Sequence, residues 1–377
     1  MRTTPFISAI PQDNINDLKA RLNRTRWPDE IEGSGWGVGT SKSYLQELCV
    51  YWADTYLWHD TEEEINTYPN FLAEIDGYTV HYIHVKGNGK KSVPLIITHG
   101  WPGSFLEMLK LIPLLTTDPD FSFDLVIPSV IGFGFSDKPK DPGCNSALVA
   151  ELWHKLMTGL GYDQYGAQGG DIGAGISSWL ALKHPENMIG LHLNYVPGSF
   201  KPYLKPGETL LPEVTEFHKK LAEWIDKEGA YSHLHATKPQ TLAYGLNDSP
   251  VGLCAWILEK FYGWSDNEDD LESVISKDEL LGNITLYWLT QTLPSSIRMY
   301  EENKKTPLTF AENEYINVPV AFASFPKELP TPPRSYIEKG YNIHQWTDMP
   351  AGGHFAAVEQ PILLSDDIKK FFKKIDR

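Results

Sequence analysis

Residues 165–173, with the sequence YGAQGGDIG, decide the fold of this chain. Residues 165–168 have strand character and residues 172–184 have a helical pattern, so Asp171 lies on a sharp turn from strand to helix. Glycines two positions before and after Asp171 are typical of a nucleophile turn, because its strained backbone and closely crossing helix require small residues. A carboxylate there can attack carbon and form an ester. A plain helix N-cap is the alternative role for Asp171.

The residues around this turn predict a sheet with alternating helices. Continuous apolar runs at 93–98 and 123–128, and a strand-like run at 189–194, are typical of parallel strands buried on both faces. Helical patterns fill the intervals, at 105–115, 148–160 and 172–184. This short alternation predicts a doubly wound parallel sheet of the α/β class.

The two ends of the chain and a long insertion differ from this pattern. Helices are predicted at 11–22 and 43–58, followed by a hairpin at 71–85 that turns at Gly77. Residues 212–305 are mostly helical, with helices at 213–227, 251–262 and 284–300. Sheet character returns at 319–325 and 342–347, before a closing helix at 361–375. An insertion between two strands of such a sheet lies over the strand ends where ligands bind.

We therefore expect four parts. They are an N-terminal extension (1–90), the first part of the core (91–200), a helical cap (201–316) and the second part of the core (317–377). The extension is expected to pack as a strap across core and cap.

Composition excludes several classes of protein. The net charge of −16, from 33 Lys+Arg against 49 Asp+Glu, argues against a nucleic-acid partner and against a basic membrane patch. The three cysteines, Cys49, Cys144 and Cys254, are too scattered for a disulfide framework and favour a reduced, cytoplasmic compartment. No segment approaches the roughly 20 apolar residues that span a bilayer. Aromatic residues make up 12%, which fits either an aromatic pocket or a well-filled core.

A histidine and a second acid follow Asp171 in the order expected of a hydrolase with this turn. His354 lies in the sequence GGHF at 352–355, after a predicted strand. Hydrolysis of an ester on Asp171 needs such a base and an acid that orients it. Glu328, just after the strand at 319–325, is the favoured acid, and Asp348 is its rival.

The loop after the strand at 93–98 is the expected oxyanion hole. It reads HGWP at 99–102, and the backbone N–H groups of Trp101 and Ile172 would stabilise the tetrahedral intermediate. Two histidine pairs, His81 with His84 and His233 with His235, have metal-ligand spacing, but no third ligand is apparent, so no metal is expected.

Several motifs together resemble the epoxide hydrolases of the α/β-hydrolase fold, in particular the microsomal-type branch with an N-terminal epoxide-hydrolase extension. The resemblance covers nearly the whole chain. Its motifs are TRWP at 25–28, HGWPGS at 99–104, GFGFS at 132–136, GGDIG at 169–173, FPKE at 325–328 and GGHFAA at 352–357. The extension begins almost at once, near Phe6, so the chain is similar to members without a membrane anchor.

The resemblance implies hydrolysis of an epoxide to a vicinal diol through a hydroxyalkyl ester on Asp171, with no cofactor. Two cap tyrosines of the family donate hydrogen bonds to the epoxide oxygen, and the matching positions are Tyr231 and Tyr300. A phenol of pKa about 10 can protonate the alkoxide of an opening ring while staying neutral at pH 7. Tyr244 and Tyr287 are the neighbouring tyrosines expected only to pack.

The substrate is expected to be a small apolar epoxide, with Trp101 and Phe135 lining its pocket. A haloalkane dehalogenase is the nearest rival function, but it commonly has Trp directly after the nucleophile, where this chain has Ile172. A Ser esterase lacks its Ser here. Two rival functions of another class are a ligand-binding protein on an inactive hydrolase scaffold and a structural partner protein. A homodimer is left open.

Overall fold

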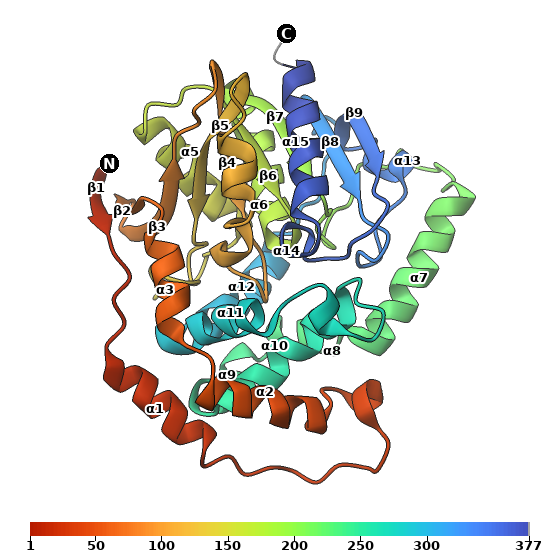
Figure 1. Ribbon diagram of the computed structural model, residues 1–377. Coiled ribbons are helices and arrows are strands. Elements are labelled where there is room, and N and C mark those ends of the chain that lie inside the picture. The colour runs from red at the N-terminus through yellow and green to blue at the C-terminus, as the bar shows by residue number, and fades with distance from the viewer. Residues whose placement is uncertain (376–377) are drawn as a thin grey trace.

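A nine-stranded sheet forms the centre of the computed structural model, which describes residues 1–375 (Figure 1). The strand order is β1-β2-β3-β5-β4-β6-β7-β8-β9. β1, β2 and β3 add antiparallel to one side, and all pairs from β5 to β9 are parallel. The strands are β1 Arg2–Phe6, β2 Asn70–Ile75, β3 Tyr78–Val85, β4 Lys91–Thr98, β5 Phe121–Pro128, β6 Tyr165–Gly169, β7 Met188–Leu193, β8 Ile316–Ser324 and β9 Tyr341–Asp348.

Helices cover both faces of this sheet, as the alternating pattern predicted (Figure 1). α5 (Ser146–Gly159) and α6 (Asp171–Lys183) pack together on one face, and α4 (Leu111–Thr116) and α15 (Pro361–Ile375) on the other. The short helices α13 (Arg334–Ile337) and α14 (Ala356–Glu359) lie in the loops near the C-terminal strands. The fold is therefore the expected α/β sheet with an inserted set of helices.

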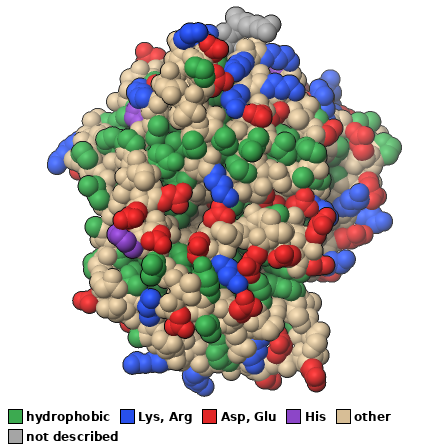
Figure 2. Space-filling view, viewed as in Figure 1, with side chains coloured by type: hydrophobic (Ala, Val, Ile, Leu, Met, Phe, Trp, Pro, Cys, Tyr) green, Lys and Arg blue, Asp and Glu red, His purple; other side chains and the backbone are tan. Residues whose placement is uncertain are grey.

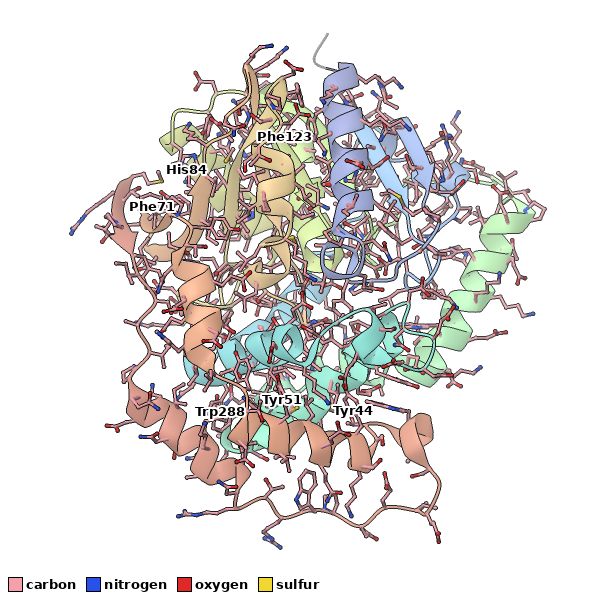
Figure 3. The ribbon with its side chains drawn as sticks, in the orientation of Figure 1. Tyr44, Tyr51, Phe71, His84, Phe123 and Trp288 are labelled. Atoms are coloured by element: carbon pink, nitrogen blue, oxygen red, sulfur yellow. The ribbon has the colours of Figure 1, made fainter. Side chains whose placement is uncertain are left out.

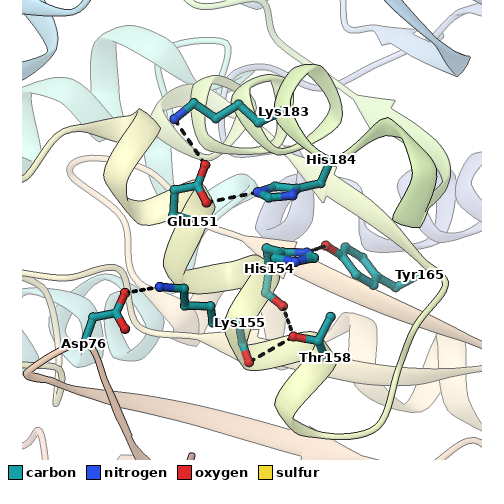
Figure 4. Close-up of polar contacts among 8 residues, drawn as sticks. All are labelled: Asp76, Glu151, His154, Lys155, Thr158, Tyr165, Lys183 and His184. Carbon is teal, nitrogen blue, oxygen red and sulfur yellow. Dashed lines mark hydrogen bonds and ion pairs between the residues drawn. The ribbon is translucent and has the colours of Figure 1, made fainter.

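A polar network joins α5 to α6 at the back of the core (Figure 4). Glu151 accepts a hydrogen bond from His184 Nε2 at 3.1 Å and pairs with Lys183 Nζ at 3.2 Å. The rings of His154 and His184 stack with centroids 3.7 Å apart. Burial opposes ionisation of Glu151, but hydrogen bonds from Lys183 and His184 outweigh it and lower its pKa. These contacts fix α6, the helix that begins at Asp171.

The inserted helices lie together below the sheet in Figure 1. They are α7 Pro212–Glu228, α8 Ala230–His235, α9 Pro239–Asp248, α10 Pro250–Trp264, α11 Lys277–Thr290 and α12 Leu293–Lys305. Hydrogen bonds from Asn283 to Pro102 O (2.8 Å) and from Tyr287 to Gly103 O (2.7 Å) attach α11 to the loop after β4. These two hydrogen bonds fix the insertion over the ends of the strands.

The N-terminal segment runs from the sheet edge around the far side of the inserted helices and back to β2 (Figure 1). It contains α1 (Gln12–Leu22), α2 (Lys42–Asp54) and α3 (Trp58–Asn66). Trp52 is buried and donates its indole N–H to Thr285 on α11 at 2.8 Å, and Tyr51 donates to Asp278 at 2.9 Å. Figure 3 places Tyr44 and Tyr51 along this boundary. The segment therefore crosses the cap as the strap that was expected.

Three predicted helices were wrong in detail, and one strand was missed. The helix predicted at 43–58 is two helices, α2 and α3, and the one at 105–115 is a short 3-10 turn, η2 (Phe105–Met108), followed by α4. The helix predicted at 284–300 breaks at Gln291, whose φ is +52°, and Pro294 opens α12 beyond the break. β1 was not predicted, because its five residues are mostly exposed and show no alternation.

The surface agrees with the charge of the sequence. Figure 2 shows Asp and Glu side chains spread over the visible face, with Lys and Arg among them. Within residues 1–375, no helix has the length and apolar character needed to cross a membrane. All three cysteines are buried and free.

His81 of β3 lies in the core and has uncharged partners. Its Nδ1 lies 2.8 Å from Ser129 Oγ and its Nε2 lies 2.9 Å from Asn70 Oδ1. His84, the other member of this histidine pair, contacts Tyr162 through Nε2 at 2.9 Å. Burial, aided by the charge of His99, lowers the pKa of His81 to about 3.

This burial predicts a pH-dependent stability. Below pH ~6.5 the unfolded chain binds a proton at His81 that the native protein does not bind, so stability falls as the pH drops from ~6.5 towards 3, by at most about 1.4 kcal/mol per pH unit. In His81→Gln, the free energy of unfolding from urea titrations at pH 7, 6 and 5 should therefore fall less steeply than in the wild type. His59→Gln, on the exposed surface of α3, is the control that keeps the wild-type slope. A wild-type slope in His81→Gln would contradict the account.

Candidate active site

The turn that carries Asp171 has the strained geometry that its sequence predicted. Asp171 has a φ of +48°, a backbone conformation that residues other than glycine rarely adopt. A Cβ on Gly173 would lie 2.0 Å from Thr98 O, and one on Gly169 would lie 2.3 Å from Gly173 O. Both glycines are therefore needed, because the backbone of α6 lies in direct contact with the backbones of β4 and β6.

Two groups hold the carboxylate of Asp171. Trp101 donates its backbone N–H to Oδ1 at 2.7 Å, and His354 Nε2 lies 3.3 Å from Oδ2. A Cβ on Gly100 would lie 2.2 Å from Oδ1, so this glycine makes room for the carboxylate. Ile172, the second expected oxyanion donor, follows as the second residue of α6 and is half-buried.

Glu328 lies on the opposite side of the His354 ring. Its Oε1 is 2.5 Å from His354 Nδ1, and both side chains are almost completely buried. Asp348, the rival acid, accepts the indole N–H of Trp346 at 2.9 Å. Burial disfavours the charged imidazole, but the negative charges of Glu328 and Asp171 outweigh it and raise the pKa of His354 well above its ordinary value. The structure thus brings Asp171, His354 and Glu328 together in one line.

The loop of His354 is fixed by the cap and by a buried acid. His354 N donates to Trp264 O at 2.9 Å, at the end of α10. Glu359 accepts three backbone N–H groups, from Asp266 (2.7 Å), Gly353 (2.9 Å) and Phe355 (2.9 Å). Burial raises the pKa of Glu359 to about 7, against the effect of these hydrogen bonds. The end of α10 therefore holds His354 in place.

The two cap tyrosines lie against Trp101 in an aromatic cage. The ring of Tyr231 stacks on Trp101 with centroids 5.4 Å apart, and Tyr300 meets the same indole edge-on at 5.9 Å. The two phenol rings are 6.0 Å apart. Burial, together with the charge of Asp171, raises the pKa of both tyrosines. Both phenols are therefore protonated at neutral pH and are able to donate.

The two neighbouring tyrosines of the cap serve different purposes. Tyr287 is buried and donates its hydroxyl to Gly103 O, so it packs as expected. Tyr244 is 72% exposed and was wrongly expected to pack, because α9 turns this position towards solvent. Tyr231 and Tyr300 are therefore the cap tyrosines that form the cage with Trp101.

Phe135 does not reach this cage. Its ring packs against Phe6 (centroids 5.0 Å apart), His81 (5.2 Å) and Phe105 (5.9 Å). The expectation that it lines the substrate pocket is therefore corrected. The unpredicted strand β1 supplies Phe6, which gives Phe135 its place in the core, and Phe133 is the residue of this motif that packs beside His99.

Sequence reasoning missed several residues of the site. His235 contacts Trp101, Tyr231 and Tyr300 edge-on, and its Nε2 accepts the indole N–H of Trp256 at 3.1 Å. Burial, and then the charge of Lys260, lowers its pKa to about 3. Trp264 and Tyr195 pack against the ring of His354, with centroids 5.2 and 5.6 Å away. His235 was noted only as half of a histidine pair with metal-ligand spacing, and Trp264 and Tyr195 stand in no motif that spacing alone would reveal.

The two histidine pairs with metal-ligand spacing have no third ligand beside them within residues 1–375. Among residues 1–375, no group of three or more His, Cys, Asp and Glu side chains is arranged to hold a metal ion.

Comparisons with known proteins identify the family. The model described as "Epoxide hydrolase N terminus" matches residues 3–108, and that of the alpha/beta hydrolase fold matches residues 93–211. Epoxide hydrolase 1 of Oryctolagus cuniculus is 37% identical, over 99% of this chain and 89% of its own.

Two solved structures agree with this. Juvenile hormone epoxide hydrolase from the silkworm Bombyx mori is 31% identical with a TM-score of 0.89, over 100% of this chain and 96% of its own. Aspergillus niger epoxide hydrolase is 30% identical with a TM-score of 0.88, and the match covers 100% of this chain and 97% of that structure's chain. The chain belongs to the epoxide hydrolase family, with an α/β-hydrolase fold and an N-terminal extension.

Proposed function

We propose that this epoxide hydrolase opens its substrate through a covalent ester on Asp171, with residues 201–316 as the cap that closes over the reacting atoms. The observation that carries the proposal is the line of Glu328, His354 and Asp171, with the N–H of Trp101 on the same carboxylate. A carboxylate held in this way has one oxygen beside a hydrogen-bond donor and the other beside a base.

In the first step, an oxygen of Asp171 attacks an epoxide carbon and the ring C–O bond breaks. The ring oxygen takes a proton from Tyr231 or Tyr300, whose rings lie against Trp101. The phenolate regains its proton from His354, which is protonated in the resting enzyme because two carboxylates flank it. Esterification also removes the charge of Asp171, so the pKa of His354 falls and the neutral ring becomes available as a base.

In the second step, His354 takes one proton from water as the water oxygen bonds to the ester carbon of Asp171. The N–H of Trp101 stabilises the oxyanion. The ester C–O bond then breaks, and the diol leaves with the other proton of that water. His354 and Asp171 return to their resting charges, so the cycle needs one water and no net proton.

The aromatic cage favours an uncharged, apolar epoxide. Trp101, Tyr231 and Trp264 are nearly completely buried, so the cage is an apolar and aromatic environment. The juvenile hormone epoxide hydrolases among the relatives carry an apolar substrate in their names, which agrees with this class for the present enzyme.

Replacing the base should trap the ester. In His354→Gln, reaction with styrene oxide should add the mass of one epoxide to the protein, because attack by Asp171 no longer leads to hydrolysis. Intact-protein and peptide mass spectrometry would place the adduct on residues 165–183. The double variant Asp171→Asn/His354→Gln is the control and should carry no adduct. An unmodified His354→Gln protein, or an adduct on another residue, would contradict the ester.

The tyrosines should act on the first step alone. Tyr231→Phe and Tyr300→Phe should each slow ester formation by ~100-fold, the lower end of the usual contribution of general acid catalysis, and leave ester decay unchanged. Rapid-quench mass spectrometry would measure both rates. Tyr244→Phe, at an exposed position of α9, is the matched control with wild-type rates. Wild-type ester formation in both site variants would remove the tyrosines from the mechanism.

A further inference from the structure

Glu107 is an acid beside the proposed ester that the mechanism above does not use. It lies on η2, directly after the sequence HGWPGS, and is half-buried, with its Oε1 fully enclosed. A Cβ on Gly103 would lie 1.5 Å from this oxygen, so the glycine makes room for the carboxyl to lie against the loop of Trp101. Gly100 makes room for Asp171 in the same way.

A small cavity of about 30 Å³ joins Glu107 to the reacting groups. Asp171, His354, Trp101 and Gln168 line it together with Glu107. This volume exceeds the roughly 10–15 Å³ that a cavity needs to hold one water. The cavity therefore has the size for one water between the ester carbon and the base.

Two enclosed oxygens of this lining have no hydrogen-bond partner within residues 1–375. They are Oε1 of Glu107 and Oε1 of Gln168. The amide N–H of Gln168 is already bonded to Asn194 at 2.9 Å, which leaves its oxygen as an acceptor. Buried oxygens without a partner are costly and are usually satisfied by an internal water.

Glu107 also lines a second cavity of about 340 Å³ that lies between α2, α3, α11 and η2. This outer cavity is partly polar, with Asp60, Glu64, Asp278 and Glu279 among its lining. Glu107 is the residue that both linings share. It thus stands between the outer cavity and the small one.

We propose that Glu107 is a positioning residue for the hydrolytic water, which it holds in the small cavity behind Asp171 and receives from the outer cavity. This inference rests on the proposed ester mechanism. One O–H of the water donates to neutral His354 Nε2, which takes that proton, and the other donates to Oε1 of Glu107. The water oxygen is then directed at the ester carbon of Asp171. Glu107 keeps its own proton throughout.

The electrostatics of Glu107 agree with this role. Burial raises its pKa to about 8, with a further contribution from the charge of Asp171 and against the opposing effect of His354. The carboxyl is therefore largely neutral at pH 7, and its carbonyl oxygen accepts a hydrogen bond without competing with His354 for the proton.

The test separates the two chemical steps with styrene oxide as the probe. In Glu107→Leu, which cannot accept a hydrogen bond, ester decay should slow by ~10-fold or more, the value of about one lost hydrogen bond. Ester formation should stay within ~3-fold of the wild type. Glu107→Gln keeps a carbonyl oxygen in the same place and should restore the decay rate. Glu107→Met is a second apolar variant in case the branched Leu side chain prevents folding.

Glu64→Gln is the matched control, because Glu64 is an acid that lines the outer cavity and not the small one. It should keep both rates and the wild-type melting temperature. Wild-type ester decay in Glu107→Leu or Glu107→Met would overturn the inference, as would an equal loss of both steps, which would mark a structural role. If the wild type and His354→Gln form no ester at all, the proposed mechanism fails instead, so the two failures are distinguishable.

Discussion

The site depends on one constraint, which is the backbone of Asp171 at a φ of +48° between β6 and α6. This conformation turns the carboxylate out of the helix axis and onto the N–H of Trp101, while His354 approaches its other oxygen. The strain is tolerated because the neighbouring glycines let α6 contact the backbone of β4 and β6 directly. The rest of the core serves to hold this turn against the ends of the parallel strands.

The cap and the strap hold the loops of His354 and Trp101 in place beside the turn of Asp171. The end of α10 binds the loop of His354 through Trp264 O, and Glu359 ties the same loop to Asp266. The strap binds α11 through Trp52, and α11 binds the loop of Trp101 through Asn283 and Tyr287. His354 and the loop of Trp101 are thus each fixed by the inserted helices. A displaced cap would therefore disturb both.

Most of the fold and the central site residues could be predicted from sequence, because their signals are local. Apolar runs marked the buried strands, and the glycines around Asp171 and His354 marked their turns. Glu328 and Asp348 each followed a predicted strand, and the order of elements favoured Glu328. In the structure, Oε1 of Glu328 lies 2.5 Å from Nδ1 of His354. The missed residues depend on contacts between distant segments. Glu107 and His235 belong to the core and to the cap respectively, and their place in the site appears only when these two parts pack together. Phe135 could not be told from Phe133 without knowledge of β1.

A single turnover in H₂¹⁸O tests the central claim most directly, with enzyme in excess over styrene oxide. If the reaction passes through the ester, the first diol carries no label, because one of its oxygens comes from the epoxide and the other from Asp171. One ¹⁸O atom then appears in the peptide that contains Asp171, because water attacks the ester carbon. The label should be found by tandem mass spectrometry at Asp171 alone. Label in the diol and none in Asp171 would show that water opens the ring directly, and would contradict the account.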